Sequence, residues 1–174
     1  MVYELFQIFK QRDFSVLRFN FRGVGRSQGA YSRGEGELSD AAAALDWMQK
    51  LKPDAKNVWV AGYSFGAWIG MQLLMRRPEI GGFFSIGAPA NLYDFSFLAP
   101  CPSSGLFLHA GQDEIVTEDS VKKLVEKLRA QRGIDIDYER IPGATHTFAT
   151  HLDQMNKSVE RYLDRRMAEQ SAAA

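Results

Sequence analysis

The pattern of hydrophobic and polar positions alternates between helix-like and strand-like segments along the whole chain. Apolar residues recur at helical spacing in five segments: 2–11, 37–51, 65–76, the stretch after Thr117 up to Gly133, and about 151–168. Short apolar runs between them are typical of strands: 14–21, 57–61, 82–87, 105–109 and 134–141. Two segments rich in glycine or proline, 22–36 and 88–103, are expected to be loops.

This alternation predicts an α/β fold. We expect a three-layer sandwich, in which a mostly parallel sheet of about five strands carries helices on both faces. The length of 174 residues suits a single domain over 1–174, with a frayed tail at 169–174. In parallel sheets, functional groups collect where the strands end at their carboxyl edge. The residues directly after each strand are therefore the candidates for chemistry.

The most informative strand end is the run Val58–Ala61, which leads into Gly62, Ser64 and Gly66 and then into a helical pattern. A strand, a sharp turn with a serine at its tip and a helix form a nucleophile elbow. Such a tight turn brings the two backbones together, so a side chain at position 62 or 66 is expected to clash. The serine is expected to adopt a strained backbone conformation that exposes its hydroxyl.

A second segment, Gly25–Gly29, matches the same Gly-x-Ser-x-Gly pattern around Ser27. It lies several residues after its predicted strand, and no helical pattern follows it. Context therefore favours Ser64 as the nucleophile and Ser27 as a residue of a glycine-rich turn.

Two further strand ends carry the partners that a serine nucleophile needs. Asp113 follows the strand at 105–109, and His146 follows the strand at 134–141. A histidine can accept the serine proton, and a carboxylate can hold the imidazole in the required tautomer. Each has an alternative: Glu114 as the acid and His151 as the base, while Asp113 and His146 could instead be ordinary loop residues.

Composition narrows the classes of function. The chain has 21 basic and 21 acidic residues, and no basic stripe interleaved with aromatics, which argues against a nucleic-acid partner. No apolar run reaches membrane-spanning length. The single cysteine, Cys101, permits no intrachain disulfide and suits a cytoplasmic location. The histidines, with His109 expected to be buried and structural, lack metal-ligand spacing, so we expect neither a metal nor a cofactor.

The elbow, the loop around Asp113, the Gly143–Phe148 loop and the segment Phe19–Gly29 together resemble the α/β-hydrolase superfamily. Within it, the chain is most similar to small, lidless bacterial serine hydrolases of the dienelactone-hydrolase and esterase type. The resemblance covers about residues 2–167. It implies that Ser64, Asp113 and His146 form a catalytic triad.

The resemblance also implies that an α/β-hydrolase core lacks its first strands here. Family members carry further strands before the opening helix, one of them between the strands placed at 14–21 and 57–61. The loop after that strand supplies one backbone N–H to the oxyanion hole, and the N–H of Phe65 supplies another. We therefore expect an N-terminally incomplete domain.

The resulting hypothesis is a serine hydrolase that cleaves small-molecule carboxylic esters or thioesters through an acyl-enzyme. Tyr93, Phe95 and Phe97 are expected to line the substrate pocket, with ordinary packing under a loop as the alternative. A catalytically impaired fragment or scaffold without a complete oxyanion hole is the main alternative function. A nucleotide-binding domain is disfavoured, because no helix directly follows Gly23–Gly25. The sequence is compatible with an oligomer.

Overall fold

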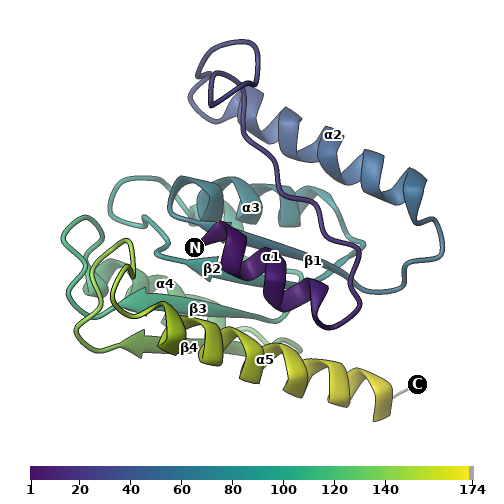
Figure 1. Cartoon of the computed structure of the whole chain (residues 1–174). Coiled ribbons are helices and arrows are strands. Elements are labelled where there is room, and N and C mark those ends of the chain that lie inside the picture. Colours follow the sequence, from purple (N-terminus) through teal and green to yellow (C-terminus); the bar gives the residue numbers. More distant parts are fainter. Residues whose placement is uncertain (173–174) are drawn as a thin grey trace.

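The structure is a computed structural model, and it describes residues 1–172 (Figure 1). The helices are α1 (Val2–Lys10), α2 (Glu35–Leu51), α3 (Phe65–Arg76), α4 (Glu118–Arg129) and α5 (Leu152–Ala172), with a short 3₁₀ helix, η1 (Ser96–Leu98). The strands are β1 (Val58–Tyr63), β2 (Ile80–Ile86), β3 (Gly105–Ala110) and β4 (Ile136–Ile141).

The strands form one four-stranded sheet in the order β1-β2-β3-β4, and every neighbouring pair is parallel. Helices α1 and α5 cover one face of this sheet, and α3 and α4 cover the other, with α2 packed outside α3 (Figure 1). The predicted α/β sandwich with helices on both faces is therefore confirmed. Because all strands run the same way, the loops that follow them meet at one edge.

Alternating residues of the central strands face opposite layers. Phe83 of β2 and Phe107 of β3 are buried in the core beside α3 and α4. Phe84 and Leu106, their neighbours in sequence, are buried in the core beside α1 and α5. This period-two alternation gives each layer its own apolar core, which is why these strands are hydrophobic on both faces.

The strand predicted at 14–21 is wrong, because this segment pairs with no strand of the described part of the chain. Phe14 and Val16 pack against the α1–α5 core, and Phe21 packs against the other core. Phe14, Val16 and Phe21 are therefore apolar because of contacts with the two cores and not because of a hydrogen-bonded ladder, whereas Leu17 and Phe19 are exposed. The sheet accordingly has four strands where about five were expected.

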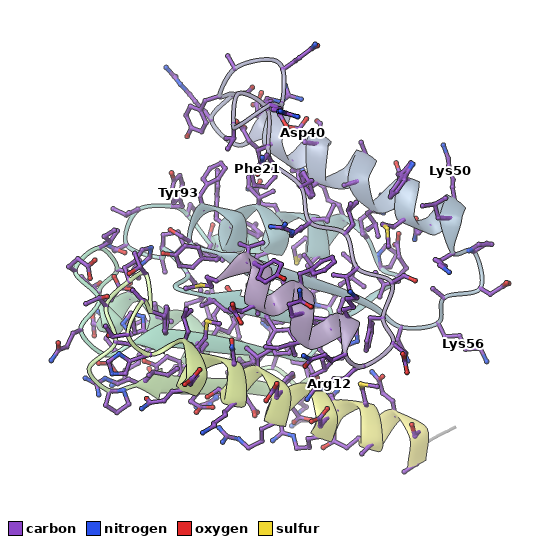
Figure 2. All side chains as sticks on the ribbon, in the orientation of Figure 1. Arg12, Phe21, Asp40, Lys50, Lys56 and Tyr93 are labelled. Atoms are coloured by element: carbon purple, nitrogen blue, oxygen red, sulfur yellow. The ribbon has the colours of Figure 1, made fainter. Side chains whose placement is uncertain are left out.

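A cavity of about 1480 Å³ separates this segment from β1. Its walls come from residues 14–21, from the inner face of α2 and from β1 as far as the turn that follows it. Helix α2 lines the cavity between Ala41 and Leu51, and Figure 2 labels Asp40 and Lys50 near the two ends of this helix. One hydrogen-bonding edge of β1 thus has no strand partner among the residues described.

Two carboxylates of α2 hold the glycine-rich segment 22–34 in place. Asp40 accepts hydrogen bonds from the guanidinium of Arg22 and from its backbone N–H, at 2.8 and 3.0 Å. The buried Glu37 accepts from the backbone N–H groups of Ser32 and Gly34, each at 2.8 Å. Burial opposes the charge of Glu37, but these bonds outweigh it and lower its pKa.

The C-terminal ends of helices α5 and α4 differ from the predicted ones. The predicted frayed tail is wrong for residues 169–172, which continue α5, while 173–174 lie outside the described residues. Ion pairs stabilise this last part of the helix, among them Arg166 with Glu169 at 2.8 Å. Helix α4 ends at Arg129, and Gly133 lies beyond it in a turn with a φ of 84°.

Phe84 is expected to be essential for the α1–α5 core. Its ring lies 5.7 Å from Phe9, 5.6 Å from Trp59 and 5.4 Å from Tyr162, so it links α1, β1 and α5. Phe84→Ala should lower the free energy of unfolding by about 3–5 kcal/mol, as measured by urea denaturation. Phe84→Leu keeps most of the volume and should cost clearly less. Equal effects of the two substitutions would contradict this role.

His109 of β3 is expected to make stability depend on pH. It is buried, and burial lowers its pKa below 6.5, while Asp113 and Glu118 oppose that shift. Between the unfolded and the folded pKa the unfolded chain binds more protons, so the free energy of unfolding falls as pH drops below 6.5. His109→Leu should flatten this dependence in urea titrations at several pH values, whereas His151→Gln should not.

Candidate active site

Ser64 lies in the turn between β1 and α3, with φ 52° and ψ −121°. Its backbone N–H donates to the carbonyl of Ile86 at 2.8 Å, which ties the turn to the end of β2. A Cβ on Gly62 would lie 2.3 Å from the carbonyl oxygen of Gly66, so only glycine fits there. The clash expected at position 66 is wrong, because a Cβ on Gly66 would meet nothing within 4 Å.

The structure brings Ser64, His146 and Asp113 together from the ends of β1, β4 and β3. The Nε2 atom of His146 lies 2.9 Å from Ser64 Oγ, and its Nδ1 atom lies 2.8 Å from Asp113 Oδ2. The side chain of Asp113 is fully buried, and that of His146 is nearly so. A carboxylate that accepts from Nδ1–H leaves Nε2 as an acceptor for the serine proton.

The other oxygen of Asp113 is also fixed. Oδ1 accepts from the backbone N–H groups of Ile115 and Val116, at 2.9 and 2.8 Å. Asp113 thus closes its own loop and orients the imidazole with the same carboxylate. The interpretation of Asp113 as a loop-capping residue and its interpretation as the triad acid are therefore compatible.

The alternative residues lie elsewhere or make other contacts. The hydroxyl of Ser27 donates to the carbonyl of Asn20 at 2.9 Å, within a turn. His151 pairs with the hydroxyl of Thr150 at 2.9 Å. Glu114 accepts from the backbone N–H of His146 at 3.0 Å, so it contacts the histidine but not its ring nitrogens. Cys101 is buried, which raises the pKa of its thiol.

Phe65 is the first residue of α3, where backbone N–H groups have no acceptor within the helix. Its N–H directly follows Ser64, in the position expected for an oxyanion donor. The positive end of the α3 dipole lies at the same point. The cavity between β1 and residues 14–21 also reaches Phe65 and Gly66.

The aromatic residues predicted to line the substrate pocket occupy two different environments. Tyr93 is half-buried and stacks on Trp68 with ring centroids 4.5 Å apart, and both rings pack near Phe65. Phe95 is buried in the core, and half-buried Phe97 stacks on it at 6.0 Å. Phe95 therefore fits the alternative interpretation of this cluster, which was ordinary packing under a loop.

Sequence reasoning missed three residues near the site. Tyr31 is 61% exposed and lies 5.9 Å from Phe65, presented by the glycine-rich segment. The hydroxyl of Tyr63 donates to the carbonyl of His146 at 3.1 Å. Gly87 has a φ of 58°, and a Cβ there would lie 3.2 Å from His146 Cε1. Gly87 directly follows β2, but the predicted strand 82–87 included it, so it was not among the residues expected after a strand end.

Among residues 1–172, no cluster of histidine, cysteine, aspartate or glutamate is arranged to hold a metal ion. Within the same residues, no helix has both the length and the hydrophobicity to span a membrane.

Comparisons with known proteins find relatives with the same fold. A crystal structure of a protein of unknown function from Agrobacterium tumefaciens is 60% identical, with a TM-score of 0.95 over 97% of this chain and 77% of that one. A lidless α/β serine hydrolase from Xanthomonas campestris is 30% identical, with a TM-score of 0.76 over 85% of this chain and 65% of that one.

An uncharacterized protein of Rickettsia prowazekii is 49% identical over 167 residues, which are 94% of this chain and 70% of the relative. Residues 27–172 match the model of the dienelactone hydrolase family, and this range contains all three side chains of the hydrogen-bonded Ser–His–Asp set. The chain therefore belongs to the dienelactone hydrolase family, as an α/β hydrolase.

Proposed function

We propose that this protein is a serine hydrolase that cleaves small carboxylic ester or thioester bonds through an acyl-enzyme. The observation that carries the proposal is the continuous hydrogen-bonded chain from Ser64 Oγ through the imidazole of His146 to the buried carboxylate of Asp113. A hydroxyl alone is a weak nucleophile, and this arrangement removes its proton as it attacks.

The reaction has two halves that use the same groups. Ser64 Oγ bonds to the substrate carbonyl carbon while its proton moves to Nε2 of His146, and Asp113 stabilises the imidazolium. The Phe65 N–H donates to the oxyanion. His146 then gives the proton to the departing alkoxide or thiolate, which leaves the acyl group on Ser64. Water then attacks the acyl carbon while His146 takes its proton, and His146 returns this proton to Ser64 Oγ as the bond between Oγ and the acyl carbon breaks, which releases the acid.

The substrate is a small molecule in this proposal, and the aromatic surface beside Ser64 favours apolar groups on it. Tyr31, Tyr93 and Trp68 surround the ring of Phe65, and Tyr31 is exposed. Flat aromatic rings favour apolar acyl or alcohol groups without selecting one chemical structure.

A catalytically impaired hydrolase is the second candidate, favoured by the open space at Gly66. Within the described residues we assign a single oxyanion donor, the N–H of Phe65, and the cavity borders it. Losing one of two donors costs about 10²–10³ in turnover number. This candidate keeps the reactive serine but turns over slowly, so probe labelling and turnover distinguish it from the first.

Ser64→Ala should abolish covalent labelling by a fluorophosphonate and lower p-nitrophenyl acetate hydrolysis by about 10⁴-fold or more, because no other group can form the acyl-enzyme. Intact-mass spectrometry and initial rates measure the two effects. Ser27→Ala is the matched control, since it changes the other Gly-x-Ser-x-Gly serine, and it should label and react like the wild type. Labelling that survives Ser64→Ala would overturn the assignment. Labelling without measurable turnover in the wild type would support the impaired hydrolase.

Gly87→Ala should lower kcat by about 10-fold or more, because a misplacement of about 1 Å at a catalytic group can cost 10²-fold. The new Cβ would lie 3.2 Å from His146 Cε1, and the φ of 58° disfavours any side chain. Gly81→Ala is the control, because a Cβ there meets nothing within 4 Å and its φ is not positive. If both variants had wild-type kcat, the close packing of Gly87 against His146 would be irrelevant to catalysis.

A further inference from the structure

The backbone of His146 is held by two side chains besides the triad itself. Its N–H donates to Glu114 Oε2 at 3.0 Å, and its carbonyl accepts from the hydroxyl of Tyr63 at 3.1 Å. Glu114 directly follows Asp113, and Tyr63 directly precedes Ser64. The residue after Asp113 and the residue before Ser64 therefore both form hydrogen bonds to the backbone of His146.

We propose that Glu114 and Tyr63 are positioning residues that fix the peptide groups of His146, so that its imidazole meets Ser64 and Asp113 at the same time. This inference rests on the proposed function, because positioning matters for turnover only if Ser64 is the nucleophile. It assigns the two residues no contact with substrate and no proton transfer.

His146 lies in a loop, and its backbone therefore needs support from side chains. It belongs to the connection between β4 and α5, outside any helix or strand, so no regular ladder fixes its backbone. Its ring must satisfy two distances at once, 2.8 Å to Asp113 and 2.9 Å to Ser64. A shift of the backbone that improves one contact can lengthen the other, and such errors of about 1 Å are costly for catalysis.

Glu114 is well suited to accept the hydrogen bond from the backbone N–H of His146. The residue is exposed, yet its carboxylate reaches back to the half-buried peptide N–H of His146. Hydrogen bonds to a charged acceptor are stronger than neutral ones. Removing the acceptor leaves that N–H without its protein partner and frees the loop to move.

Tyr63 contacts His146 in two ways: its hydroxyl donates to the backbone carbonyl, and its ring packs against the imidazole. The ring centroids of Tyr63 and His146 are 5.2 Å apart, at an interplanar angle of 36°. A Cβ on Gly87 would approach both rings, at 3.2 Å from His146 and 3.6 Å from Tyr63, so the two rings pack together over this glycine. Burial, followed by the charges of Asp113 and Glu114, raises the pKa of the Tyr63 phenol, which therefore remains a donor.

The first test separates the hydrogen bond from the charge of Glu114. In p-nitrophenyl acetate hydrolysis, Glu114→Ala should lower kcat by about 10- to 100-fold and change KM by less than about threefold, because the transition state suffers more than binding. Glu114→Gln keeps an acceptor oxygen and should restore kcat to within about threefold of wild type. Glu126→Ala, on the exposed face of α4, is the control and should behave like wild type.

The second test observes the histidine directly, without turnover. The Nδ1 proton shared with Asp113 should give a low-field proton resonance in the wild type, identified by its loss in His146→Gln. Glu114→Ala should shift or broaden this resonance, and Glu114→Gln should leave it close to its wild-type position. Tyr63→Phe keeps the ring but removes the donor, so it should shift the same resonance and lower kcat.

The outcomes discriminate between the two proposals. If the wild type shows no Ser64-dependent hydrolysis or labelling, the proposed function fails, and the resonance alone decides whether His146 is positioned as described. Wild-type kcat and an unchanged resonance in Glu114→Ala would overturn the positioning role. Equal losses in Glu114→Ala and Glu114→Gln would overturn it too, since the charge would then matter and not the hydrogen bond. If Glu114→Ala does not fold by circular dichroism, Glu114→Gln and Tyr63→Phe carry the test.

Discussion

The approach of the β1 and α3 backbones at Gly62 is the constraint on which the rest of the site depends. A Cβ at this position would lie 2.3 Å from the carbonyl oxygen of Gly66, so the turn closes only around a glycine. This closure forces Ser64 to a positive φ of 52°, a conformation that costs free energy in a non-glycine residue. The bond from its N–H to Ile86 helps to hold the turn, and the hydroxyl is left facing His146.

The parallel sheet supplies the remaining alignment. Because β1, β3 and β4 end at one edge, the loops that carry Ser64, Asp113 and His146 meet without any long-range bend of the chain. Local bonds then refine the positions, since Asp113 is fixed by two backbone N–H groups of its own loop. The fold therefore brings the groups within reach, and side-chain to backbone hydrogen bonds set the final distances.

Sequence patterns were informative wherever the cause is local. The strand–glycine–serine–helix order specified the elbow at Ser64, and strand ends led to Asp113 and His146. The strand predicted at 14–21 failed because a strand needs a hydrogen-bonding partner, and this run pairs with no strand of the described residues although Phe14, Val16 and Phe21 pack on the two cores. The hydrogen bond between Glu114 and His146 joins residues that are 32 positions apart in the chain, and no rule of sequence spacing predicts such a contact.

The two halves of the site differ in the contacts that hold them in place. The half that would activate Ser64 is held by several hydrogen bonds, which are made through Asp113 and through the backbone of His146. The half that would stabilise the oxyanion borders the cavity, and a Cβ on Gly66 would meet no atom there within 4 Å. In the proposed reaction, attack by Ser64 uses both halves, because the oxyanion forms as His146 takes the serine proton, and complete turnover uses both halves twice. Reactivity toward a covalent probe and the rate of ester hydrolysis are therefore separate measurements of the proposed site, because labelling reports one attack whereas the rate of hydrolysis reports every step of the cycle.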